Sequence, residues 1–129
     1  CREANINPDA LDHCYMQYGD EHYRDIPDIL LRYIDRGIPQ FDSVICGNDR
    51  IAFMVYQTLL TQGIRIPQDI AVLGYDNLVG IGNLFLPPLS TVQLPHYEIG
   101  RLSTLHIING DSHREKVLVD SPWLLRESF

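Results

Sequence analysis

The chain has 129 residues, of which 45% are apolar and 21% charged, a composition typical of one globular domain and not of a disordered segment. Its 17 acidic and 10 basic side chains give a net charge of −7, without the clustered positive charge by which a protein grips a nucleic acid backbone. No apolar run is long enough to span a membrane, and three cysteines without metal or redox spacing predict a reducing compartment, the cytoplasm.

The first third of the chain predicts a strand followed by a helix. Residues 13–18 form an apolar and aromatic run typical of a strand, which Gly19 closes. Over residues 25–36 apolar side chains recur at helical spacing. Asp25 is the expected N-cap of this helix, and Gly37 is expected to stop it.

The middle of the chain predicts a strand, a helix and a further strand. Residues 43–46 read as a buried strand, and residues 49–62 as an amphipathic helix that Gly63 ends. Residues 70–75 are almost continuously apolar, which is typical of a parallel strand covered on both faces. Two strands joined by a helix form a right-handed βαβ unit. With the preceding strand and helix, the order is βαβαβ, and we predict an α/β fold with a parallel sheet.

The last third predicts a loop, a crossing segment, a helix and a terminal strand region. Residues 80–88 are rich in turn formers, and residues 89–94 read as a strand or an extended crossing. A helix is expected from Pro95 to about residue 109, with Ile99, Leu102 and Leu105 facing inward. Residues 117–119 and 123–125 are expected to form a last strand pair, or one strand broken by Pro122.

Polar side chains follow three predicted strands at the points where those strands end. They are Asp20 after the first strand, Asn48 and Asp49 after the second, and Asp76 and Asn77 after the third. Because the carboxyl ends of parallel strands line one edge, these groups suit a small ligand rich in hydroxyl groups. Each residue alone is also a common helix cap or turn former. Their coincidence at three strand ends favours a binding site.

An enzyme is the competing class. Asp49 and Asp76 could form an acid–base pair or bind Mg²⁺. However, the sequence has no glycine-rich phosphate loop, no serine nucleophile elbow and no zinc pattern. Cys46 is expected to be a buried structural thiol. We therefore predict no catalytic residue, no metal and no cofactor, and a protein that is not an enzyme.

Four segments resemble, in order and spacing, the effector-binding region of LacI/GalR-family transcriptional repressors. They are Cys-Gly-Asn-Asp at 46–49, Ile-Pro-Gln-Asp-Ile-Ala-Val-Leu-Gly-Tyr-Asp-Asn at 66–77, Pro-Pro-Leu-Ser-Thr-Val at 87–92 and Leu-Leu-Arg-Glu-Ser at 124–128. Each segment is short, but together they extend the resemblance from about residue 10 to the end of the chain. The resemblance implies a type I periplasmic-binding-protein-like fold, here one three-layer αβα lobe.

The same resemblance implies that the chain is a fragment of a two-lobed domain. Residues 1–94 would form the second lobe with its βαβαβ core, and residues 95–110 a return helix that packs with a first lobe absent here. Residues 111–129 would be a terminal strand segment that rejoins the second lobe. Operator DNA would be bound by a helix-turn-helix headpiece outside this chain, with a small-molecule effector between the lobes altering operator affinity.

Family resemblance also assigns roles to particular side chains. The expected ligand-binding residues are Asn48, Asp76, Asp20, Tyr23 and Asp49. Asn48 and Asp76 match positions that hydrogen-bond a sugar or nucleobase-type effector, whereas Asp49 could instead cap the helix or support the site from behind. Many members carry an aromatic residue after the first strand, where this chain has Glu21, so the effector stays open.

Family members are usually homodimers, and exposed apolar side chains are the expected interface. The candidates are Phe85, Leu84, Phe53 and Tyr56; alternatively, Phe85 covers the edge of this lobe's own core. A periplasmic sugar-binding protein of the same fold, serving transport or chemotaxis, is the second functional hypothesis. The Arg-Glu-Ser pattern at 126–128 favours the regulator.

Overall fold

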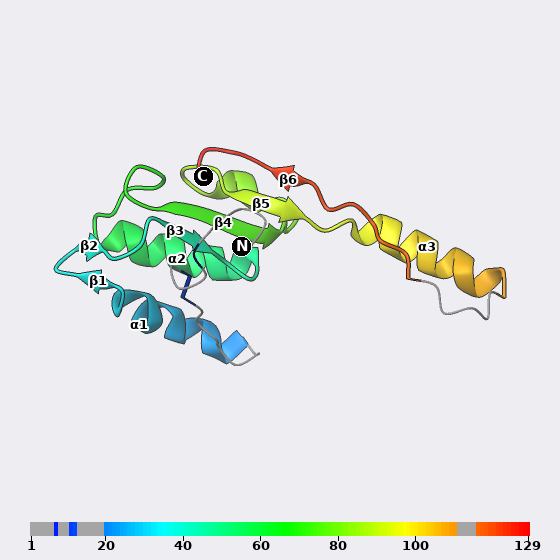
Figure 1. Cartoon of the computed structure of the whole chain (residues 1–129), viewed down its shortest axis with the longest axis horizontal. Helices are drawn as coiled ribbons and strands as arrows, with labels where there is room; N and C mark the ends of the chain where they lie inside the picture. The colour runs from blue at the N-terminus through cyan, green and yellow to red at the C-terminus, as the bar shows by residue number, and fades with distance from the viewer. Residues whose placement is uncertain (1–6, 8–10, 13–19, 111–115) are drawn as a thin grey trace.

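The computed structural model describes residue 7, residues 11–12, residues 20–110 and residues 116–129. Its main sheet has the spatial order β3 (Ser43–Ile45), β4 (Ala71–Asp76), β5 (Ser90–Gln93) and β6 (Trp123–Leu124) (Figure 1). The pairs β3–β4 and β4–β5 are parallel, whereas β6 runs antiparallel to β5. This mostly parallel sheet confirms the predicted α/β class.

Two helices lie on one side of the sheet, and a short turn of helix lies in the loop after β4. Helix α2 (Asp49–Thr61) connects β3 to β4 and packs against β4, and α1 (Ile26–Leu31) packs against α2 (Figure 1). The 3₁₀ helix η2 (Asp20–Asp25) leads into α1, and η3 (Gly82–Leu84) lies between β4 and β5. The β3–α2–β4 unit is the βαβ unit that the sequence predicts.

Helix α2 has a defined signal at each end. The side chain of Asn48 accepts a hydrogen bond from the backbone N–H of Ile51 at 2.8 Å, which satisfies one of the orphan donors of the first turn. At the other end Gly63 adopts a φ of 74°, and Ile64 N–H bonds the carbonyl of Leu59 at 3.0 Å. This is the expected glycine C-terminal motif.

The hydrophobic core lies between α2 and the sheet. Its fully buried side chains include Ala52 and Leu59 from α2, Val72 from β4, and Ile70 and Leu89 just before β4 and β5. Removing this apolar surface from water is the main favourable contribution to folding.

Two residues expected at a dimer interface belong to this core instead. Tyr56 is 3% exposed and Phe85 is 6% exposed, and their rings meet edge to face with centroids 4.8 Å apart. The Tyr56 hydroxyl donates a hydrogen bond to the carbonyl of Pro87 at 3.0 Å. The alternative reading, in which Phe85 covers the core of its own lobe, is therefore the correct one.

The helix predicted over residues 25–36 is shorter than expected. It ends at Leu31, and a hairpin of β1 (Ile34–Asp35) and β2 (Ile38–Pro39) follows. Arg36 (φ 50°) and Gly37 (φ 79°) are both left-handed, the conformation that a tight two-residue hairpin turn requires. The glycine thus forms the turn and does not stop the helix. The strand predicted over residues 13–18 lies outside the described residues.

Helix α3 (His96–Ile108) extends away from the sheet, at the end where β5 leaves it (Figure 1). None of its residues is buried: Ile99 is 45% exposed and Leu105 42%. No described element buries these side chains, so the face expected to point inward has no core within this chain. Packing of residues 95–110 against a first lobe stays a prediction. Residues 117–119 form no strand, so β6 is the one strand of the described terminal segment, residues 116–129, that joins the sheet. Among the described residues, no helix is both long and apolar enough to span a lipid bilayer.

The end of the chain is bonded into the middle of the sheet. Ser128 is fully buried, and its hydroxyl donates to the carbonyl of Val72 and accepts from Ser90 N–H, both at 2.7 Å. The backbone N–H of Val72 in turn donates to the carbonyl of Ser128 at 2.7 Å. Ser128 therefore links β4 to β5 through one side chain.

Replacing Ser128 with alanine tests this link. The buried Ser90 N–H would lose its acceptor, and we expect the free energy of unfolding to fall by about 1–3 kcal/mol. Urea unfolding measures the change, with S103A on the exposed face of α3 as the control. Equal stability of S128A and S103A would contradict the assignment.

Candidate functional site

The carboxyl ends of the parallel strands bring the predicted polar residues together. β4 and β5 point to the same end of the sheet (Figure 1), and the turn after β4 is bonded directly to the start of α2. The contact is a hydrogen bond from Leu78 N–H to Oδ2 of Asp49, at 2.8 Å. The Asn48–Asp49 pair and the Asp76–Asn77 pair therefore form one polar edge.

Asn48 serves as a helix cap and also contacts a second predicted residue. While its Oδ1 caps α2, its Nδ2 donates to the hydroxyl of Tyr23 at 3.2 Å. An amide nitrogen carries two donors, so one N–H of the half-buried Asn48 is not used in this bond. Asp20 begins the same 3₁₀ helix as Tyr23, and its side chain lies outside the description.

Asp49 does not cap α2, and its side chain is buried inside the lobe. It is fully buried, with Oδ1 accepting from the Thr91 hydroxyl and Oδ2 accepting from Leu78 N–H, each at 2.8 Å. The alternative in which Asp49 supports the site from behind fits this geometry. Its carboxylate joins α2, β5 and the turn after β4.

The space for this carboxylate depends on Gly74, a residue the sequence did not single out. A Cβ at Gly74 would collide with Oδ1 of Asp49, and would lie 2.9 Å from Leu89 Cδ2 and 3.2 Å from Thr91 Oγ1. Only glycine leaves room at this point of β4, because the obstacles are a fixed carboxylate and two packed side chains.

Asp76 ends β4 in a left-handed conformation, with φ at 95°. Its Oδ1 is buried and has no hydrogen-bond partner among the described residues. Burial and the negative charge of Asp49 raise the pKa of Asp76, while a backbone hydrogen bond from Leu78 and the charges of His96 and Arg50 oppose that rise. A buried acceptor without a partner is costly, and a hydroxyl donor would satisfy it.

One further residue of the site, Arg126, was not predicted from the sequence. Oδ1 of Asn77 accepts a hydrogen bond from Nη2 of Arg126 at 3.2 Å. Arg126 was noted only as part of a terminal motif, whose order along the chain says nothing about a contact with the turn after β4.

Cys46 is the buried structural thiol that the sequence predicts. It is 3% exposed, and burial, with a smaller effect from Asp49, raises its pKa to about 12. A thiol held protonated in this way is a poor nucleophile and metal ligand. Within residues 20–110 and 116–129, no group of three or more His, Cys, Asp or Glu side chains is arranged to hold a metal ion.

The parallel sheet and its polar carboxyl edge define an α/β lobe of the small-molecule-binding class. The family described as periplasmic binding proteins and sugar binding domain of LacI family matches residues 10–127, and the chain belongs to this family. The predicted family and the periplasmic-binding-protein-like fold are thereby confirmed.

Curated relatives agree with this assignment. The sucrose operon repressors of Escherichia coli and Shigella flexneri are 50% identical over 125 residues, which is 97% of this chain and 38% of each repressor. The ribose operon repressor of Haemophilus influenzae is 39% identical over 91 residues, 67% of this chain and 27% of that protein. The chain thus spans well under half the length of these relatives.

A solved structure agrees as well. A LacI family transcriptional regulator from Arthrobacter sp. FB24, in complex with lactose, superposes with a TM-score of 0.66 at 28% identity. The match covers 82% of this chain and 39% of that one. The relatives are transcriptional repressors and regulators, not enzymes.

Replacing Gly74 with alanine tests the packing behind the site. Because the new methyl group would displace the Asp49 carboxylate, we expect a loss of about 1–3 kcal/mol in the free energy of unfolding. Gly47 is the matched control, since a Cβ there meets only Ile51 Cδ1, at 3.7 Å. Chemical denaturation compares the free energies of unfolding of the two variants. If G74A is as stable as G47A, the Asp49 carboxylate is free to move and the packing assigned to it is wrong.

Proposed function

We propose that this chain is the effector-sensing part of a LacI-family transcriptional repressor whose effector is a sugar. The observation that carries the proposal is Oδ1 of Asp76, which is buried at the carboxyl edge of the sheet and has no hydrogen-bond partner among the described residues. A sugar offers several hydroxyl donors, and a carboxylate oxygen accepts them strongly. Similarity to sucrose operon repressors over 97% of the chain supports a disaccharide such as sucrose.

The remaining ligand contacts follow from the same edge. The Asn48 amide nitrogen lies 3.2 Å from the Tyr23 hydroxyl. The amide can donate a hydrogen bond to a sugar, and the neighbouring hydroxyl can donate or accept one. Asp20 stays a predicted ligand residue, because it begins the 3₁₀ helix that carries Tyr23. Asp49 holds the turn beneath these groups and makes no contact with the sugar.

The proposed mechanism is conformational. A sugar held between this lobe and a second lobe shifts their closure, which alters how paired headpieces meet operator half-sites. The effector then changes operator affinity by the same factor by which the operator changes effector affinity. For a tenfold change, the sugar must bind one lobe arrangement about 1.4 kcal/mol more tightly than the other. No cofactor takes part, and the protein acts in the cytoplasm.

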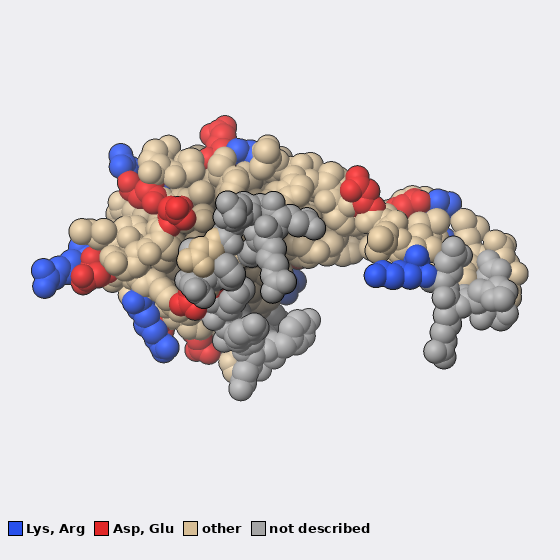
Figure 2. Space-filling view, in the orientation of Figure 1, with Lys and Arg blue, Asp and Glu red and all other residues tan. Residues whose placement is uncertain are grey.

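DNA contact is assigned to a headpiece outside this chain. The net charge is −7, and on the face drawn in Figure 2 the basic side chains are scattered and form no continuous patch. The alternative, a periplasmic sugar-binding protein, shares the fold. Its support is weaker, because the relatives reported above are transcriptional repressors and regulators.

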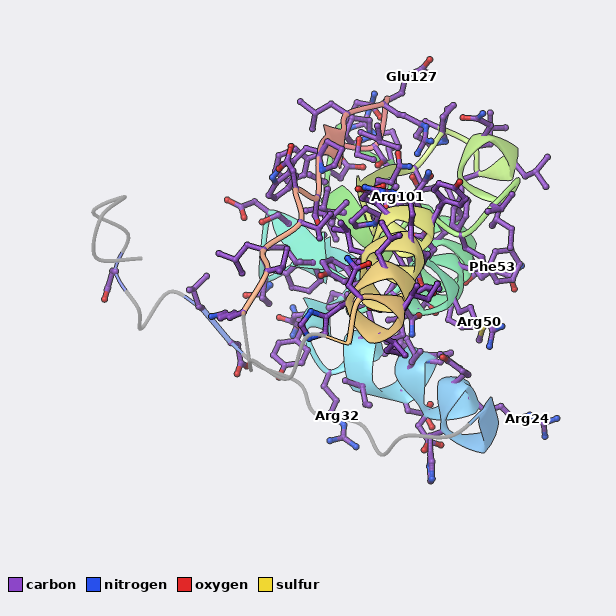
Figure 3. All side chains as sticks on the ribbon, turned by 90° about the vertical axis from the view of Figure 1, so that its right-hand side faces the viewer. Arg24, Arg32, Arg50, Phe53, Arg101 and Glu127 are labelled. Atoms are coloured by element: carbon purple, nitrogen blue, oxygen red, sulfur yellow. The ribbon has the colours of Figure 1, made fainter. Side chains whose placement is uncertain are left out.

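A homodimer is part of the proposal, with the interface revised. Leu84 (80% exposed) and Leu86 (81%) project from the loop before β5, and Phe53 (47%) lies on the outer face of α2. Figure 3 shows Phe53 pointing outward from α2 on the same side as Arg50. The Phe53 ring packs edge to face on buried Phe85, with centroids 6.0 Å apart.

The sugar-binding role predicts opposite effects of Asp76→Asn on binding and on stability. Sugar affinity should fall by about tenfold or more, because the charged acceptor is lost. Stability without sugar should rise at pH 7, because the variant removes a partly buried negative charge close to Asp49. The pKa of Asp76 is raised by folding, so the wild-type penalty is present above that pKa and disappears as the pH falls through it.

Calorimetric titration with sucrose, and thermal unfolding of both proteins between pH 7 and pH 4, measure these effects. The difference in unfolding midpoint should shrink toward pH 4. Wild-type sugar affinity in D76N would refute the site assignment.

The dimer proposal is tested with Leu84→Glu. A buried glutamate at a subunit contact is unfavourable, and we expect the dimer dissociation constant to rise by about tenfold or more. Sedimentation analysis of the intact protein measures it, with I38E in the remote β1–β2 hairpin as the control. Unchanged association of L84E would remove this loop from the interface.

A further inference from the structure

The turn that presents Asp76 is held in an unfavourable backbone conformation. Asp76 (φ 95°) and Asn77 (φ 49°) are consecutive left-handed residues, and neither is glycine. Such conformations cost free energy and persist where surrounding contacts hold them, most often at functional sites. The contacts that hold this turn therefore determine where the Asp76 carboxylate lies.

Three hydrogen bonds hold the turn from three directions. Leu78 N–H donates to Asp49 at 2.8 Å, and Asn77 N–H donates to the Thr91 hydroxyl at 3.4 Å. The third runs from the Arg126 guanidinium to Oδ1 of Asn77, at 3.2 Å. It is the only one of the three that uses a side chain of the turn itself.

Arg126 connects both ends of the loop between β4 and β5. Besides Asn77, its guanidinium donates to the carbonyl of Leu89, and its backbone N–H donates to the Ser90 hydroxyl at 2.8 Å. The guanidinium also lies beneath Gly82, where a Cβ would be 2.8 Å from Nη1 and 3.2 Å from Cζ. It thus fills the space under the loop and ties the loop's start to its end.

We propose that Arg126 is a positioning residue for the effector site, and that it holds the left-handed Asp76–Asn77 turn through its bond to Asn77. The inference rests on the proposed sugar-binding function. Arg126 does not touch the effector; it keeps Oδ1 of Asp76 in the position from which a sugar hydroxyl can donate to it. The competing role is a purely structural one, in which Arg126 only anchors the end of the chain.

Arg126→Lys separates these roles. Lysine keeps the charge and can reach one acceptor, but it cannot span Leu89 and Asn77 as the planar guanidinium does. Glu127→Gln is the matched control, because Glu127 is exposed and projects from the body of the molecule (Figure 3). In the intact protein, titrated with sucrose, we expect about tenfold weaker binding in R126K, the loss of one charge-assisted hydrogen bond, and no change in E127Q.

A double-mutant cycle with Asn77→Ala identifies the route. If Arg126 acts through Asn77, the double variant R126K/N77A binds sucrose no more weakly than the weaker single variant. Losses of affinity that add, or wild-type affinity in N77A, would overturn the proposal and leave Arg126 as an anchor. Melting temperatures of all variants show whether each loss of sucrose affinity is accompanied by a loss of stability.

Amide hydrogen exchange without sugar tests the positioning directly. The Asn77 and Leu78 amides should exchange about tenfold faster in R126K than in the wild type, whereas amides in the middle of α2 should not change. Failure of the wild-type protein to bind sucrose or any other sugar would refute the proposed function, while exchange at the turn would still decide the role of Arg126. Unchanged exchange at these two amides would overturn that role.

Discussion

The buried carboxylate of Asp49 is the interaction on which the rest of this lobe depends. It accepts one hydrogen bond from β5, through Thr91, and one from the turn after β4, through Leu78. A buried carboxylate is stable only when its oxygens accept hydrogen bonds. Asp49 therefore needs both of these donors, and it also needs the space that Gly74 leaves by having no side chain. The location of the Asp76 carboxylate follows from them, because the turn that carries it is bonded to Asp49.

Local signals were enough to predict the central part of the fold. A strand with an apolar run, a polar cap and a helix with a terminal glycine specify β3, α2 and β4 without distant information, and their polar ends were correctly expected at one edge. Gly63 ends α2 as predicted, and Asn48 caps its start. Where periodicity alone was used, as over residues 25–36, it did not distinguish a helix from a helix followed by a hairpin, because Gly37 is compatible with both.

Long-range contacts explain what could not be predicted. Whether Phe85 faces a partner or its own core depends on its contacts with Tyr56 and Phe53, about thirty positions earlier. The sequence around Phe85 does not reveal these contacts. The capping role of Asn48 and the burial of Asp49 could not be predicted for the same reason. Both are good caps by type, and only the location of Thr91 shows which of them is buried. Arg126 is still more remote from Asn77, and its contact becomes visible only in three dimensions.

The bonds of Ser128 have a consequence for the kinetics of folding. They connect Ser128 to Ser90 and Val72, residues 38 and 56 positions earlier, and β6 joins β5 across the whole of α3. Non-local pairings of this kind require closure of long loops before they stabilise anything, and they slow folding. During synthesis from the amino terminus, β4 and β5 emerge well before the serine that links them. The edge of β5 therefore stays open in the nascent lobe until β6 and Ser128 have left the ribosome.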